Sequence, residues 1–209
     1  MTARDEILKR VKGTPTELPI LKSRTRQYDN LGEQFAVALK RSKGETYLTD
    51  SKQATVEKLG EVLTELDIET IVTHREAPLT DLGLQEEFPD LHWFFAGETK
   101  DYRTRCTKAD LGLTSAEAAF AETGSLVLVS GSDKARMTSL LPPVHLVLLP
   151  ESRILPSIFE WVQARPEEFP ANLVLVSGPS KTADIEQTLI VGVHGPKRLI
   201  VIVYGDRDG

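Results

Sequence analysis

Two short loops hold the most reactive polar groups in the sequence, and each adjoins a strongly apolar segment. The first loop places a carboxylate, two hydroxyls and a glycine before an apolar run, as Glu122, Thr123, Gly124 and Ser125. Glu122 offers a nucleophile, a base or an anchor for a polar ligand, and the glycine permits a tight turn or close approach of a ligand to the backbone. In the structural alternative, Glu122 ends a helix over 115–122 and Gly124 follows its C-terminus.

The second loop follows the apolar segment 173–177 and leads into a predicted helix. It supplies a glycine, hydroxyls, a lysine and a carboxylate, as Gly178, Ser180, Lys181, Thr182 and Asp184. At a helix N-terminus, unpaired backbone N–H groups, hydroxyls and a lysine favour an anion beyond the carboxyl end of the strand. The spacing matches neither a P-loop nor a dinucleotide-binding fingerprint. In the structural alternative, Ser180 or Thr182 caps the helix and Asp184 complements its dipole.

The histidines and the cysteine limit the remaining chemistry. His194 lies between two glycines, where it is a candidate for proton transfer near neutral pH; a structural histidine in a turn is the alternative. His145 sits inside the apolar segment 144–149, so we expect it to be buried and hydrogen-bonded. The four histidines are far apart in sequence and give no local zinc signature. The single cysteine, Cys106, cannot hold an iron–sulfur cluster, which takes about four thiolates.

The composition is that of an ordinary globular protein. Of 209 residues, 40% are hydrophobic and 27% are charged, which excludes wholesale disorder. The net charge of -6 does not fit a nucleic-acid-binding protein, which needs clustered lysine and arginine. The charged segment 1–11 makes no signal peptide, and no run reaches the ~18 apolar residues of a membrane span. We therefore expect a cytoplasmic protein with no nucleic-acid partner and no membrane span.

The elements that must position these loops alternate between strand and helix patterns, which is typical of βαβ units. We predict strands over 46–49, 69–74, 92–95, 125–130, 144–149, 173–177 and 198–204. We predict helices over 2–11, 31–43, 51–66, 81–87, 115–122, 156–164 and 180–189. The predicted fold class is α/β, a mostly parallel sheet with helices on both faces. Residues 1–30 are interpreted as an N-terminal helix and extended arm, and residues 31–209 as a single domain. The aromatic run at 92–95 is interpreted as a buried strand, with a nucleotide-stacking platform as the alternative.

Several motifs taken together resemble the lactate utilization protein C family, which is also described by its LUD domain. They are GLTSAE at 112–117, AETGSL at 121–126, LLP at 140–142, SGPSKTADIE at 177–186 and GVHGP at 192–196. The strong likeness covers residues 108–204, and the first half of the chain agrees only in length and general pattern. The resemblance implies a fold similar to the superfamily of sugar-phosphate isomerases, CoA transferases and formyltetrahydrofolate cyclo-ligases.

The resemblance also implies a function. Members of this family belong to a three-protein system that oxidises L-lactate to pyruvate, in which the two partners carry iron–sulfur clusters. We expect a non-cluster component that binds a small anionic ligand or cofactor, whose identity is open, between the two loops. Glu122 and Thr123 would orient this ligand, the residues from Ser180 to Thr182 would hold its charged end, and His194 would lie nearby.

Two other functions remain open from the sequence. One is a stand-alone transferase or ligase that uses CoA or a nucleotide, with Glu122 as the nucleophile. It rests on an analogy between the Glu-Thr-Gly turn at 122–124 and the Glu-Asn-Gly turn of CoA transferases. The other is a non-catalytic scaffold for iron–sulfur partners. The site hypothesis requires both loops to lie at one strand edge and to form a single pocket.

Overall fold

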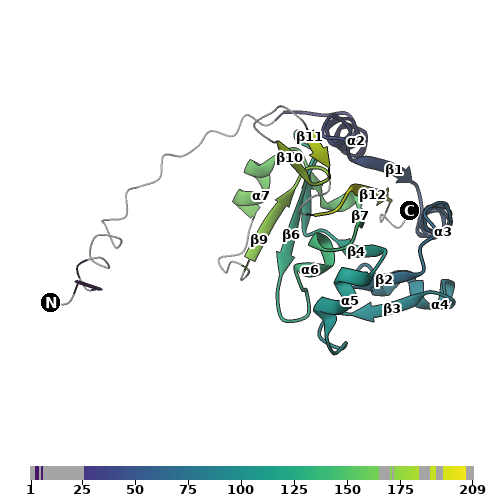
Figure 1. Cartoon of the computed structure of the whole chain (residues 1–209). Coiled ribbons are helices and arrows are strands. Elements are labelled where there is room, and N and C mark those ends of the chain that lie inside the picture. Colours follow the sequence, from purple (N-terminus) through teal and green to yellow (C-terminus); the bar gives the residue numbers. More distant parts are fainter. Residues whose placement is uncertain are drawn as a thin grey trace.

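The computed structural model describes residues 3–4, 6, 26–164, 170, 172–183, 189–191 and 195–205 (Figure 1). Two candidate site residues, Asp184 and His194, lie outside the described residues, as do most of the predicted helix over 2–11 and of the predicted arm. Within the described ranges, no helix is both long enough and apolar enough to span a bilayer.

Six parallel strands form the larger sheet, in the order β1-β12-β7-β4-β2-β3. Their bounds are Glu45–Thr49 (β1), Thr70–Thr73 (β2), His92–Phe95 (β3), Leu111–Ser115 (β4), Val144–Pro150 (β7) and Arg198–Tyr204 (β12). β7 and β12 are almost continuous runs of buried apolar residues, as expected of parallel strands covered on both faces. The predicted α/β class with a mostly parallel sheet is confirmed.

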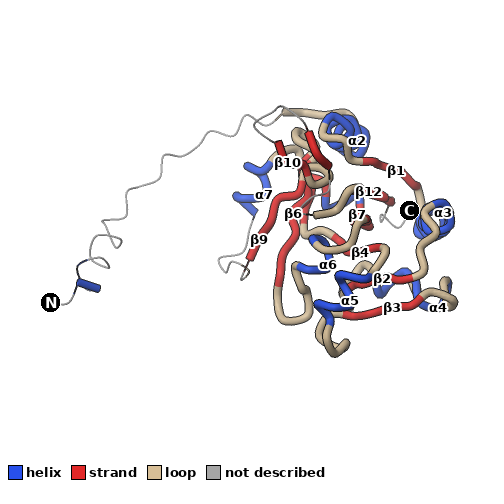
Figure 2. Tube along the Cα trace, in the orientation of Figure 1, coloured by secondary structure: helices blue, strands red, loops and turns tan. Residues whose placement is uncertain are grey.

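Helices cover both faces of this sheet (Figure 2). On one face, α3 packs with the short helices η1 and α4 against alternate strand residues such as Ile71 and Ile202. On the opposite face lie α2, α5 and α6. The bounds are Leu31–Arg41 (α2), Lys52–Glu65 (α3), Thr80–Leu82 (η1), Leu84–Glu87 (α4), Tyr102–Lys108 (α5) and Met137–Leu140 (α6).

The long helices begin where the sequence predicts. Asn30 caps α2 by accepting from the Glu33 N–H, and Ser51 caps α3 by accepting from the Ala54 N–H. The predicted helix over 81–87 is divided at Gly83, whose φ of 59° lies in the left-handed region that favours glycine.

A smaller sheet packs on the α2 side of the larger one. Its order is β8-β5-β6-β9, and β6 runs antiparallel to both of its neighbours. Leu126 of β6 contributes to the core between the two sheets, and Trp161 of α7 contacts Phe120 on the outer face. The bounds are Ala118–Phe120 (β5), Ser125–Ser130 (β6), Ile154–Leu155 (β8), Ile158–Ala164 (α7) and Asn172–Val176 (β9).

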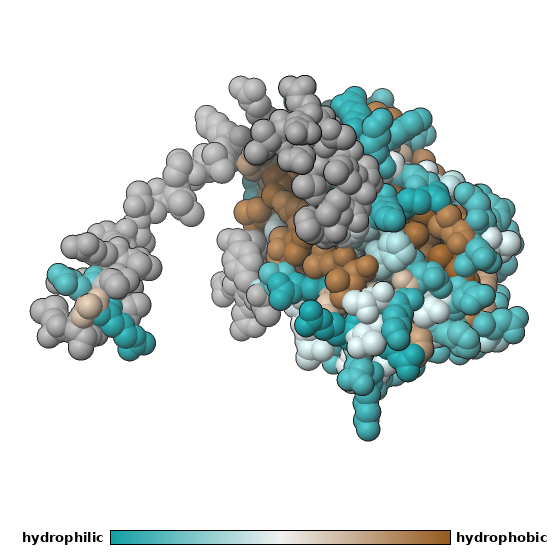
Figure 3. All heavy atoms as spheres, viewed as in Figure 1, coloured by the Kyte–Doolittle hydropathy of each residue, from teal (hydrophilic) through white to brown (hydrophobic). Residues whose placement is uncertain are grey.

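Apolar residues remain partly exposed on α7 and at the end of α6, and they form part of the apolar surface near the smaller sheet (Figure 3). The exposed fractions are 38% for Phe159, 43% for Val162 and 41% for Leu140. The larger sheet is covered more completely.

The predicted helix over 115–122 is wrong. Alanine and glutamate favour a helix there, but Ser115 ends β4 and Ala118–Phe120 forms β5. Ala119 packs towards the larger sheet, and Phe120 packs towards α7. This alternation of period two buries both faces of a strand, and tertiary burial outweighs the helix propensity.

The predicted helix over 180–189 is also wrong where the structure describes it. Residues Lys181–Ala183 form the strand β10, which pairs antiparallel with β11, Leu189–Val191. The β-branched residues of both segments favour strands. The second loop therefore does not present a helix N-terminus at 180–183.

Candidate functional site

A small cavity lies at the carboxyl ends of β2 and β4, two neighbouring strands of the larger sheet. The chain leaves β2 towards β3 on the α3 face, and it leaves β4 towards β7 on the opposite face. The two connections diverge and leave a crevice between them, which is where open α/β sheets bind ligands. We call this crevice the switch-point cavity. Its polar lining includes His74, Glu76, Ser115, Lys134, Arg136 and Arg153.

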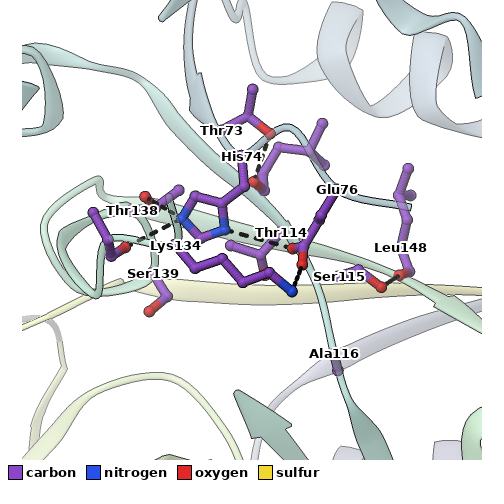
Figure 4. A network of polar contacts seen from close by, with 12 residues as sticks. Thr73, His74, Glu76, Thr114, Ser115, Ala116, Lys134, Thr138, Ser139 and Leu148 are labelled. Atoms are coloured by element: carbon purple, nitrogen blue, oxygen red, sulfur yellow. Dashed lines mark hydrogen bonds and ion pairs between the residues drawn. The ribbon is translucent and has the colours of Figure 1, made fainter. Parts of the chain in front are cut away.

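A shielded carboxylate lies in one wall of the cavity (Figure 4). Glu76 forms an ion pair with Lys134 Nζ, and its Oε1 lies 3.5 Å from Nδ1 of His74. The side chain of Glu76 is only 12% exposed. Burial favours a higher pKa for Glu76, but the hydrogen bonds and charges of His74 and Lys134 outweigh it and lower the pKa to about 2. Glu76 is therefore an anion at neutral pH, and it holds the Lys134 ammonium at the cavity.

A chain of hydroxyls holds the ring of His74 from its other side. His74 Nε2 lies 2.9 Å from Thr138 Oγ1 and 3.2 Å from the carbonyl oxygen of Ala135. A carbonyl oxygen only accepts, so Nε2 carries a proton. Tyr102 donates to the carbonyl oxygen of Thr73 at 3.1 Å and accepts from Thr138 at 2.8 Å. Burial raises the pKa of the Tyr102 hydroxyl, so this donor keeps its proton.

The glycine at position 112 of β4 allows α6 to reach the sheet. A methyl group on Gly112 would overlap the carbonyl oxygen of Thr138. α6 therefore rests on the backbone of the strand, and this places the Thr138 hydroxyl beside His74. A larger residue at position 112 would force the helix away from the sheet.

The carboxyl end of β4 supplies a second polar wall. Ser115 Oγ donates to the carbonyl oxygen of Leu148 at 3.0 Å and accepts from Nη1 of Arg153 at 3.3 Å. The same Nη1 donates to the carbonyl oxygen of Ala116 at 2.7 Å. One nitrogen of the Arg153 guanidinium is thus anchored to the strand end.

His145 of β7 lies beneath this wall. It is 1% exposed, and its Nε2 lies 2.9 Å from Thr114 Oγ1, so the prediction of a buried, hydrogen-bonded histidine is confirmed. Burial, with a smaller contribution from the charge of His74, lowers the pKa of His145 to about 3. His145 is therefore neutral at physiological pH and adds no charge to the site.

The cavity carries a small excess of positive charge. Three cations and two carboxylates line it, namely Lys134, Arg136, Arg153, Glu76 and Glu117. Before His74 is counted, these groups sum to one net positive charge, which favours an anionic ligand. Within the part of the chain that the structure describes, no group of three or more histidine, cysteine, aspartate and glutamate side chains is placed to hold a metal ion.

The structure brings the two sequence-predicted loops together, where the start of β6 meets the end of β9. Ser125 Oγ lies 2.7 Å from Ser177 Oγ and 2.8 Å from Thr123 Oγ1. We call the region formed by residues 122–125 and 177–181 the hydroxyl junction. Its hydroxyls bond one another across the two strands.

The end of α2 packs against this junction. Gly124 has a φ of 67°, and a methyl group there would overlap the backbone nitrogen of Leu39. A methyl group on Gly178 would come within 2.6 Å of the carbonyl oxygen of Ser42, to which Lys181 Nζ also donates at 2.6 Å. Both glycines therefore accommodate the backbone of the protein itself.

The other predicted site residues have separate positions. The Glu122 carboxylate lies 3.5 Å from Arg26, whose side chain is 68% exposed. The backbone N–H of Ser180 donates to the carbonyl oxygen of Pro196 at 2.9 Å, and Thr182 lies on β10. Neither Glu122 nor Ser180 lines the switch-point cavity. A ligand-binding role for the residues of the junction stays a prediction.

The sequence analysis missed the charged residues of the cavity. His74 is the last residue of the predicted strand 69–74, Glu76 lies just beyond it, and Lys134 follows the predicted strand 125–130. Polar residues at an end of an apolar strand were the signal used for the two loops, and it applies here as well. The cavity residues lack an accompanying glycine motif, and their meeting depends on strand order.

The fold and the cavity define an α/β protein with a charged cavity at the switch point of a parallel sheet. The chain belongs to the LUD domain family, which it matches over residues 32–204, so the resemblance seen in the motifs is confirmed.

Two relatives and one solved structure document this relationship. Lactate utilization protein C of Halalkalibacterium halodurans is 35% identical over 173 residues, which cover 76% of this chain and 74% of that protein. Lactate utilization protein C of Macrococcus caseolyticus is 30% identical over 170 residues, or 76% of this chain and 73% of that protein. The crystal structure of a DUF162 family protein from Deinococcus radiodurans has the same fold, with a TM-score of 0.57 at 23% identity, covering 84% of this chain and 96% of that chain.

Proposed function

We propose that this protein acts in lactate utilization, as a non-cluster component of a system that oxidises L-lactate to pyruvate, and that it binds a small anionic ligand. The observation that carries the proposal is the similarity to two proteins named lactate utilization protein C, at 30% and 35% identity over three quarters of the chain. The net positive lining of the switch-point cavity supports the anionic ligand.

We include in this proposal partners that carry iron–sulfur clusters. Clusters are held by several cysteine thiolates, whereas this chain has one cysteine. Cys106 is buried, and burial raises its pKa to about 11. The thiolate is the form that ligates metals, so Cys106 is poorly suited to contribute even one ligand. The redox centres of the proposed system would therefore lie in its partners.

Growth on L-lactate tests the proposal. Deleting the gene should abolish growth of the source organism on L-lactate and leave growth on pyruvate unchanged, because only the oxidation step is lost. Restoring the wild-type gene should restore growth. Normal growth of the deletion strain on L-lactate would contradict the pathway assignment.

The same strain separates ligand binding from scaffolding and from transferase chemistry. We expect Lys134→Gln to restore growth poorly, because it removes a cation from the cavity. If Lys134→Gln restores growth fully, a scaffold for the iron–sulfur partners becomes the better account. If Glu122→Gln alone fails, the result supports the alternative in which Glu122 is a nucleophile.

A further inference from the structure

Arg153 and Lys134 line the switch-point cavity together with apolar residues. We propose that the switch-point cavity binds a short-chain monocarboxylate, whose carboxylate group is received by Nε and Nη2 of Arg153 and by the ammonium group of Lys134. This assignment deepens the proposed function and rests on it for the choice of an anionic ligand. It names the class of ligand and the residues that contact it.

The hydrogen bonds of Arg153 leave one edge of its guanidinium for a ligand. Nη1 has two hydrogens, and it donates to Ser115 Oγ and to the carbonyl oxygen of Ala116. Among the residues that the structure describes, Nε and Nη2 have no acceptor. These two nitrogens form the planar fork that matches a carboxylate in a bidentate manner. Because Nη1 is anchored to the end of β4, the fork is fixed before the ligand arrives.

Lys134 lines the same cavity and offers further donors to the ligand. Its ammonium group has three N–H donors and pairs with Glu76, while its side chain is 36% exposed. Glu76 is in turn held by His74, which is fixed by Thr138 and the carbonyl oxygen of Ala135. Lys134 therefore contacts the ligand, and Glu76 is a positioning residue.

The fixed charges of the lining favour a small anion. His74 aside, the three cations and two carboxylates around the cavity sum to one positive charge, which a monoanion matches. A phosphate dianion would leave an excess of negative charge next to Glu76 and Glu117. The planar fork pairs with either a carboxylate or a phosphate in a bidentate manner, so it is the two carboxylates of the lining that disfavour a phosphate dianion.

The rest of the lining suits a short apolar tail. Leu128, Leu140 and Val174 contribute to the cavity beside the charged residues. Leu128 is 8% exposed, and it lies in the smaller sheet that faces the carboxyl end of β4. A short-chain carboxylate contacts both the charged residues and the apolar residues of this lining.

Calorimetric titration of the purified full-length chain tests the assignment. L-lactate, pyruvate and propionate are the probes, inorganic phosphate is the competing anion, and L-lactamide is the uncharged control with the shape of lactate. We expect at least one carboxylate to bind with a Kd of about 1 mM or tighter. We expect phosphate to bind more weakly and L-lactamide not to bind.

Variants assign the contacts. Lys134→Gln and Arg153→Lys should each weaken carboxylate binding by about tenfold or more, since each loses a charge-assisted hydrogen bond. Arg153→Lys keeps the charge and removes the fork, so a loss of affinity in this variant is due to the geometry of the fork. Arg103→Gln, at an exposed position on α5, is the matched control and should change nothing. Thermal melting checks that each variant is folded. Arg136→Gln, at an exposed position, is a second variant of the cavity lining that carries little risk of unfolding the protein.

The role of Glu76 has its own readout. Glu76→Asp keeps the charge and should retain most of the affinity, whereas Glu76→Ala should lose affinity although it removes a negative charge from the cavity. Tighter binding by Glu76→Ala would mean that Glu76 only competes with the ligand for Lys134, and it would overturn the positioning role.

Three results would overturn the proposal as a whole. They are no heat of binding for any carboxylate, tighter binding of phosphate than of every carboxylate, or unchanged affinity in both Lys134→Gln and Arg153→Lys. These failures are distinguishable from failure of the proposed function, because a deletion strain that cannot grow on L-lactate would keep the pathway assignment without this ligand site.

Discussion

The hydroxyl junction and the switch-point cavity contain similar groups but differ in what those groups face. In the junction, Ser125 and Ser177 bond each other, and Gly124 packs against the backbone of α2. In the cavity, Glu76 and Lys134 are paired at the border of an open space. The polar groups of the junction satisfy one another within the protein, whereas the cavity leaves donors for a ligand.

This difference shows what a glycine in a polar loop can mean. A glycine in a loop allows another group to approach the backbone closely. That group can be a ligand or another part of the chain, and the sequence does not distinguish the two. At Gly124 and Gly178 the approaching groups are Leu39 and Ser42 of the chain itself. The motif therefore has a packing explanation, which leaves open a ligand role only for groups that α2 does not cover.

The largest effect on stability is expected from Gly124→Ala in the junction. The added methyl group would overlap the Leu39 backbone and occupy a left-handed conformation, so we expect the free energy of unfolding to fall by about 4 kcal/mol. Urea unfolding measures the change. Gly131→Ala is the control, because a methyl group there meets open space, and it should change stability by less than about 0.5 kcal/mol. Equal effects of the two variants would show that the packing of α2 on Gly124 is loose.

The second test compares wild type with Glu76→Gln as a function of pH. The pKa of Glu76 falls from 4.5 to about 2 on folding, so the folded state binds its proton only at lower pH than the unfolded state. The stabilisation is complete above pH 4.5 and is lost as the pH falls towards 2. It amounts to on the order of 3 kcal/mol.

Urea unfolding at several pH values measures this difference. Wild type should be the more stable protein at neutral pH, and its advantage over Glu76→Gln should shrink between pH 4.5 and 2. An advantage that stays constant down to pH 2 would mean that the Glu76 carboxylate gains nothing from His74 and Lys134.

The variant with the smallest expected effect on stability tests most directly whether the ligand binds at the junction or at the cavity. Ser125→Ala removes the hydroxyl shared by Thr123 and Ser177 and should lower the free energy of unfolding by about 1 kcal/mol. It should leave carboxylate affinity unchanged, since Ser125 does not line the cavity. A loss of affinity comparable to that of Lys134→Gln would instead place the ligand at the junction, as the sequence analysis predicts.

Much of the larger sheet was predictable because its strands are buried on both faces. Runs such as residues 146–149 and 199–203 are apolar throughout, and few other structures bury every residue of a short segment. The segment around Ala118 was not predictable in this way. Its alanines favour a helix, and only the presence of two sheets explains why they form a strand.

The candidate site was likewise predictable only in part. The meeting of the two loops was predictable because each adjoins an apolar strand, and β6 pairs with β9. The cavity was not predictable, because His74 and Lys134 are brought together by the strand order and by the docking of α6. Neither of these can be read from a local sequence pattern. The interior position of His145 was predictable from its apolar neighbours and is confirmed.

The contact between Gly112 and Thr138 has a use beyond this molecule. Because strand and helix touch there without any intervening side chain, the residue type at this one position reports on a histidine that lies elsewhere in the chain. In any LUD domain whose counterpart of Gly112 is larger, α6 must sit farther from the sheet, and the counterpart of His74 must find another acceptor. A single aligned column would then divide the family into proteins that retain this ion-pair arrangement and proteins that have replaced it.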